Sequence, residues 1–193
     1  TLLELTVHPP GRVDREAGII RDVKVLGNES KFTNGRSRRK YSESAKQQAA
    51  RLYEGMKVNL DHPDKKTPDA ERGFIESIGE LRGVEVKSDG VYAKELHYNR
   101  KHPLTEALAE AAERFPNQFG LSHNAEGRVV NRGGKNLVEE ITKVRSVDLV
   151  SDPATVRGLF ESRSPTMTRT TREILEATFP GRLKLIEEMD AAG

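Results

Sequence analysis

Three polar positions in this sequence could together carry out nucleophilic catalysis: His62, Ser122 and the pair Ser146/Asp148. Serine hydrolysis needs a hydroxyl, an imidazole that takes its proton, and a third polar group that orients the imidazole and stabilises its charged form. The sequence supplies such a set. Spacing alone does not establish that the side chains meet.

Each of these positions lies on a predicted strand or just after one. Alternation of apolar and polar residues predicts strands over 56–60, 119–125 and 136–150. Ser122 falls on the face opposite its apolar neighbours, and Ser146 and Asp148 share one face of the third strand. The strands must therefore bring these faces together if the residues act as one site.

The tetrahedral intermediate of such a reaction also needs donors for its oxyanion, normally backbone N–H groups or an arginine. The loop Asp152–Gly158 follows the third strand and could supply them, with Arg157 as a possible helper.

Other roles are open to the histidines. His62 precedes Pro63 and could be a turn residue bonded to Asp64. His123 could be the acting imidazole, although as the neighbour of Ser122 on a strand it would point to the opposite face. Asp61, His62 and Asp64 could bind a metal, but the pattern is loose, and we expect neither a metal nor a cofactor.

The remaining pattern predicts a protein rich in short strands. Ser42 can cap a helix that runs to about Glu54, and Pro103 opens a second helix with a regular apolar stripe. Further strands are expected over 3–7, 18–26, 73–86, 90–96 and 127–130, with turns at 88–90 and 132–134.

The composition narrows the class of protein. Hydrophobic residues make up 35% of the 193 residues, which suits one modest core, and the absence of cysteine rules out disulfides, thiol nucleophiles and zinc–thiolate sites. A net charge of +2 disfavours nucleic acid as the default partner, so the basic run 36–40 predicts a solvated loop rather than a phosphate contact. No apolar run approaches the ~20 residues of a membrane span. No secretory segment is found at the start of the chain. The chain begins with Thr1 rather than Met, which is typical of a processed or trimmed piece.

The character of the sequence changes after Phe160. Residues 162–170 are rich in Ser, Thr, Arg and Pro, and a capping-box pattern at Thr170 precedes two short helical stretches. We expect one domain over 1–160, and over 161–193 a linker and short helical tail, directed toward a scaffold region or removed by self-cleavage.

Three segments resemble, in this order, the motif regions of the tailed-phage prohead maturation proteases, which are related in fold to the herpesvirus assemblins. The segments are Asn59–Pro63, Phe119–Ala125 and Ser146–Ala154, and the resemblance covers roughly 18–160. It implies an α+β fold of mainly antiparallel strands, a compact β-barrel wrapped by helices.

The same resemblance implies site residues. Ser122 corresponds to the nucleophile and His62 to the general base. In the family a histidine or glutamate stands where this chain has Ser146. Asp148 lies two residues further along, on the same face of the strand, and it is acidic. We therefore assign Asp148 the role of orienting the imidazole, with Ser146 as the alternative.

The implied function is a serine endopeptidase that processes scaffold and major capsid protein, and also itself, within an assembling prohead in the host cytoplasm. Self-association is compatible with this function, and no membrane is involved. Two alternatives stay open: a non-catalytic scaffold or core protein that keeps the fold, and a nucleic-acid binder that uses the basic loop.

Overall fold

The computed structural model describes residues 12–31, 38–63 and 72–160. The strand expected over 3–7 and the linker and tail expected over 161–193 lie outside the described residues. The domain boundary near residue 161 therefore stays a prediction.

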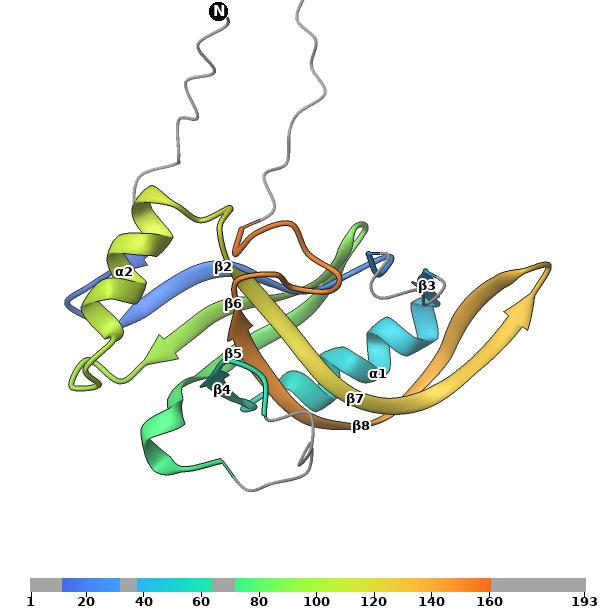
Figure 1. Ribbon diagram of the computed structural model, residues 1–193, viewed down its shortest axis with the longest axis horizontal. Helices are drawn as coiled ribbons and strands as arrows, with labels where there is room; N and C mark the ends of the chain where they lie inside the picture. Colours follow the sequence, from blue (N-terminus) through green and yellow to red (C-terminus); the bar gives the residue numbers. More distant parts are fainter. Residues whose placement is uncertain (1–11, 32–37, 64–71, 161–193) are drawn as a thin grey trace, which may run out of the picture. The chain divides into compact units, whose positions relative to one another are not determined.

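The described chain forms one sheet of eight strands (Figure 1). The strands are β1 Val13–Asp14, β2 Ile19–Gly27, β3 Arg39–Tyr41, β4 Lys57–Leu60, β5 Ser77–Lys87, β6 Gly90–Tyr98, β7 Gly120–Arg132 and β8 Lys135–Val150. They lie in the order β1-β2-β6-β5-β4-β8, with β3 and β7 also paired to β8.

Antiparallel pairing dominates, as expected, but the sheet is open. Within the described residues, five pairings are antiparallel, and only β3 and β4 run parallel to β8. The expected closed barrel is wrong. Closure requires each strand to pair on both sides, whereas β1 pairs only with β2 and β7 only with β8.

The hairpin of β7 and β8 forms a long curved ribbon, yellow to orange in Figure 1. The sequence predicts two short strands over 119–130, but the structure has a single strand, β7, because Gly127 does not interrupt it. A Cβ at Gly127 would collide with the carbonyl oxygen of Glu140, so glycine permits a close approach of the two backbones. Register shifts around this point let the ribbon bend.

Two α-helices accompany the sheet, α1 Glu43–Tyr53 and α2 Thr105–Arg114. The Ser42 hydroxyl accepts a hydrogen bond from Ala45 N at 3.0 Å, which confirms the predicted cap. The second helix begins two residues after Pro103, later than predicted.

Helix α1 packs against β8, β5 and β6 and covers part of the apolar core. Its buried residues Ala45, Ala49 and Tyr53 recur at helical spacing, and Ala49 and Tyr53 are fully inaccessible. The start of the strand predicted over 73–86 is instead a 3₁₀ turn, η1 Phe74–Glu76, in which Glu76 Oε2 accepts from Gly73 N at 2.6 Å. In the described part of the chain, no helix has the length and apolar character of a membrane span.

Candidate active site

Asp148 lies at the centre of the candidate site, in the middle of three adjacent strands. In the ladders its Cα partners are Asn59 on β4 and Ser122 on β7. Directly opposed residues on neighbouring strands project from the same face, with Cβ atoms about 5 Å apart. The parallel pairing of β4 with β8 therefore creates a row of three polar side chains across the sheet.

Asp148 is fully buried, and three side chains contact its carboxylate. His62 Nδ1 lies 2.8 Å from Oδ2, Ser146 donates its hydroxyl to Oδ2 at 2.8 Å, and Asn59 donates to Oδ1 at 3.4 Å. A buried carboxylate is stable only when such partners replace water. An ionised carboxylate only accepts hydrogen bonds, so the proton of the neutral His62 ring belongs on Nδ1. The other ring nitrogen, Nε2, is then able to accept a proton.

His62 reaches Asp148 from a turn that follows β4. Asp61 has a left-handed backbone conformation, with φ of 56°, and its N–H donates to Leu149 O at 3.0 Å. Aspartate tolerates this conformation better than most residues. The turn places the His62 ring over Asp148 with its side chain 48% exposed, so the ring is accessible from solvent.

Ser122 is 3% exposed and lies beside Asp148 on the adjacent strand. Its hydroxyl makes no hydrogen bond with any described residue, and the structure does not join it to His62. Ser146 contacts Asp148 rather than the imidazole. The structure thus brings His62 and Asp148 together, with Ser122 next to them.

His123 lies away from this cluster and contacts two tyrosines. Its Nδ1 is 2.5 Å from the Tyr53 hydroxyl, and its Nε2 is 3.4 Å from the Tyr41 hydroxyl. Burial, with smaller electrostatic contributions from His62 and Arg39, lowers the pKa of His123 to about 4. Burial also raises the pKa of Tyr53, so both rings stay neutral near pH 7.

The proposed oxyanion loop lies close to the strand that carries Ser122. A Cβ at Gly120 would come 3.0 Å from Val156 Cγ2 and 3.1 Å from the carbonyl of Gly158. Leu159 N also donates to Pro116 O at 2.7 Å, which ties the loop to the residues before β7. Arg157 itself is exposed, and its part in stabilising an oxyanion stays a prediction.

Sequence reasoning missed three contributors to this region: Asn59, Arg72 and Tyr53. Asn59 stands inside the first motif, and this position was the available signal. Arg72 and Tyr53 lie in other segments, and nothing local in the sequence connects them with His62.

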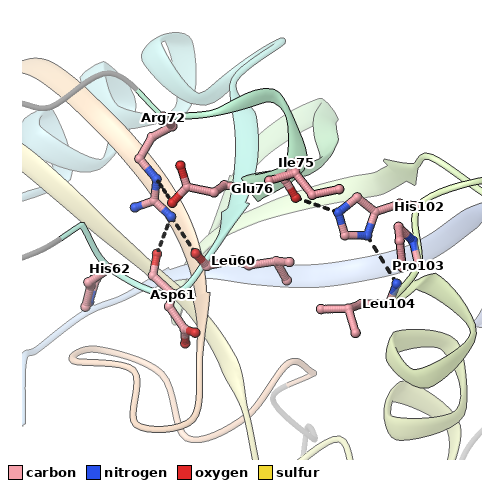
Figure 2. Close-up of a pocket in the computed structure, with 9 residues that line it drawn as sticks. All are labelled: Leu60, Asp61, His62, Arg72, Ile75, Glu76, His102, Pro103 and Leu104. Atoms are coloured by element: carbon pink, nitrogen blue, oxygen red, sulfur yellow. Dashed lines mark hydrogen bonds and ion pairs between the residues drawn. The ribbon is translucent and has the colours of Figure 1, made fainter.

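A cavity of about 420 Å³ lies beside His62, between the end of β4, η1 and the residues before α2 (Figure 2). An adjoining cavity of about 350 Å³ is mainly apolar and is lined by residues such as Leu108, Phe119 and Leu149. Leu60, Asp61 and Leu104 border both. Leu104, just before α2, is 50% exposed and lines both cavities.

Among the described residues, no group of three or more His, Cys, Asp and Glu side chains is arranged to hold a metal ion. Asp64, one member of the alternative metal pattern, lies outside the described residues.

No protein-family model and no curated protein matches this chain. A search of solved structures finds similarity to the bacteriophage T4 capsid assembly protease, gp21, with a TM-score of 0.46 and 19% sequence identity. The match covers 70% of this chain and 91% of that chain.

Proposed function

We propose that this chain is a serine endopeptidase in which Ser122 is the nucleophile, His62 the general base and Asp148 the orienting carboxylate. The observation that carries the proposal is the buried Asp148, which bonds His62 Nδ1 at 2.8 Å and has Ser122 as its neighbour on the next strand. A carboxylate, an imidazole and a hydroxyl in this order are the parts that serine hydrolysis requires.

In the proposed reaction, Ser122 Oγ attacks the peptide carbonyl while His62 Nε2 takes the hydroxyl proton. The imidazolium is stabilised by Asp148 and then gives its proton to the leaving amine as the C–N bond breaks. Water then attacks the acyl-enzyme by the same route and releases the acid. The reaction requires Ser122 Oγ to come within about 3.2 Å of Nε2, a contact that often tightens only in the substrate complex.

The two adjoining cavities support a polypeptide substrate. Both lie next to the turn that carries His62, and their volumes of about 420 and 350 Å³ each suit one or two side chains of an extended chain. From the resemblance of the three motifs, we propose that the substrates are scaffold and major capsid protein, and the chain itself, within an assembling prohead in the host cytoplasm.

A serine-reactive fluorophosphonate tests the proposal without knowledge of the natural cleavage site. We expect a single label, mapped by mass spectrometry to Ser122, and loss of both labelling and cleavage of an added scaffold or capsid polypeptide in Ser122→Ala. Loss of the nucleophile typically lowers rates by ~10⁴–10⁶-fold. Ser44→Ala, at an exposed position of α1, is the matched control.

The same assay separates the two histidines. His62→Ala should lose labelling as fully as Ser122→Ala, whereas His123→Gln should retain it. If Ser122→Ala still cleaves the polypeptide at the wild-type rate, the assignment of Ser122 as the nucleophile is wrong. A folded wild-type protein that is not labelled and does not cleave would favour the non-catalytic scaffold role.

A further inference from the structure

Arg72 contacts the turn that carries His62 from a different segment of the chain. Its Nη2 donates to the carbonyl oxygen of Leu60 at 2.5 Å and to that of Asp61 at 3.2 Å (Figure 2). In an extended strand, successive carbonyls point in opposite directions. One guanidinium nitrogen can bond both only because the left-handed Asp61 turns the two oxygens toward the same side.

Arg72 is itself fixed in place. Its Nε lies 3.0 Å from Glu76 Oε1, and the other oxygen of Glu76 accepts from Gly73 N at 2.6 Å. The Arg72 side chain is only 14% exposed, and among the described residues Nε has only its ion pair with Glu76, without hydrogen-bond geometry, while Nη1 has no hydrogen-bond partner. Burying a permanently charged guanidinium with incomplete hydrogen bonding is unfavourable. Packing alone therefore does not account for an arginine at this position.

The His62 ring needs such external support. Its side chain is 48% exposed, and among the described residues Asp148 alone forms a hydrogen bond with the ring. The backbone of Asp61 is tied to β8 through Leu149 O on one side, and Arg72 holds its carbonyl on the other. Together these bonds determine the direction in which His62 leaves the strand.

We infer that Arg72 is a positioning residue, which keeps His62 Nδ1 on Asp148 by holding the carbonyls of Leu60 and Asp61. The catalytic consequence of this contact rests on the proposed function, but the contact itself does not. Arg72 does not touch the reacting atoms. It acts only through the conformation of the Asp61 turn.

Arg72→Met keeps an unbranched apolar stem and removes the guanidinium. We expect the rate of fluorophosphonate labelling at Ser122 to fall by ~10²-fold, the loss that a misplacement of about 1 Å can cause. In the Asp148→Asn background, where His62 has already lost its carboxylate partner, Arg72→Met should lower the labelling rate by a much smaller factor. The effects of two residues that act through one contact are not additive.

Arg114→Met is the matched control. Arg114 also pairs with a glutamate four residues away, Glu110 at 2.8 Å, but the pair is exposed and lies on α2. This variant should label at the wild-type rate. Arg72→Lys should recover only part of the loss, since an ammonium cannot reproduce the planar fork that bonds the carbonyls and pairs with Glu76.

Nitrogen NMR of the His62 ring gives a readout that needs no catalytic activity. The wild-type and Arg114→Met proteins should show the proton on Nδ1, and Arg72→Met should show a mixture of tautomers. If Arg72→Met does not fold, Glu76→Gln, which removes the charge that anchors Arg72 and keeps a side-chain oxygen for Gly73 N, should give the same change to a smaller extent.

The two proposals fail in different ways. If the wild-type protein is not labelled but shows the Nδ1 tautomer, and Arg72→Met loses that tautomer, the peptidase proposal is rejected and the positioning role of Arg72 is retained. An unchanged tautomer in folded Arg72→Met, or an equal loss of labelling in Arg114→Met, would overturn the inference about Arg72.

Discussion

Asp148 and Ser146 have the same facing on β8, but their contacts differ. Only Asp148 contacts the His62 ring, whereas Ser146 donates its hydroxyl to the carboxylate of Asp148. A carboxylate can both select the imidazole tautomer and stabilise the imidazolium, whereas a hydroxyl that orients the carboxylate has an indirect effect.

We therefore expect Asp148→Asn to lower the rate of fluorophosphonate labelling by ~10⁴-fold, because an amide favours the wrong tautomer. Ser146→Ala should lower it far less, since Asn59 and His62 still contact Asp148. Labelling rates of the two purified variants check this order, and a greater loss in Ser146→Ala would reverse the assignment.

His123 predicts a pH dependence of stability. Its pKa is lowered from 6.5 to about 4 in the folded chain, mainly by burial. Above pH 6.5 the ring is neutral in both states and has no effect. As the pH falls from 6.5 toward 4, the ring is protonated in the unfolded chain but not in the folded chain. The free energy of unfolding therefore decreases, by at most about 3 kcal/mol.

His123→Gln removes this titration while keeping a polar group near Tyr53. We expect the variant to lose less stability than the wild type between pH 7 and pH 4.5, as measured by urea denaturation at several pH values. Parallel stability curves for the two proteins would contradict the prediction.

At the scale of elements, α1 packs against β8, the strand that carries Asp148. Its cap residue Ser42 accepts from Ala45 N and donates to Glu139 O at 3.2 Å, so one hydroxyl both starts the helix and ties it to β8. Tyr53, the last residue of the helix, then contacts His123.

Ser42→Ala should lower the free energy of unfolding by about 1 kcal/mol, the usual effect of losing a cap. Urea denaturation at neutral pH measures the change. Ser44→Ala, on the exposed side of the same first turn, should stay within about 0.5 kcal/mol of the wild type. Equal effects in the two variants would show that the cap contributes nothing.

For the molecule as a whole, the last described residues are tied to the sheet. Lys24 N donates to Leu159 O at 3.0 Å, and the Arg12 guanidinium lies 4.6 Å from the centre of the Phe160 ring, which is 5% exposed. These contacts fix the end of the described chain against β2 and the residue before β1.

A chain that ends at Glu161 should therefore fold and keep its labelling at Ser122. Circular dichroism and the fluorophosphonate assay on this shortened chain test both statements. Unfolding or loss of labelling would place residues 162–193 within the catalytic domain and move the predicted boundary.

The sequence by itself determined the features that depend on neighbouring residues. The Ser42 cap, the turn at 88–90 between β5 and β6, and the alternating segments around Ser122 and Asp148 follow from local periodicity and turn chemistry. The candidates His62, Ser122 and Asp148 came from those local patterns together with a resemblance in motif order.

Only the tertiary structure decided which of these residues meet. The parallel pairing of β4 with β8 aligns Asn59 with Asp148, and the bonds from Arg72 orient the turn before His62. The open sheet was likewise not predictable, because strand pairing joins segments far apart in the chain. Alternation indicates which face of a strand a residue occupies, but it does not indicate which strand lies beside it.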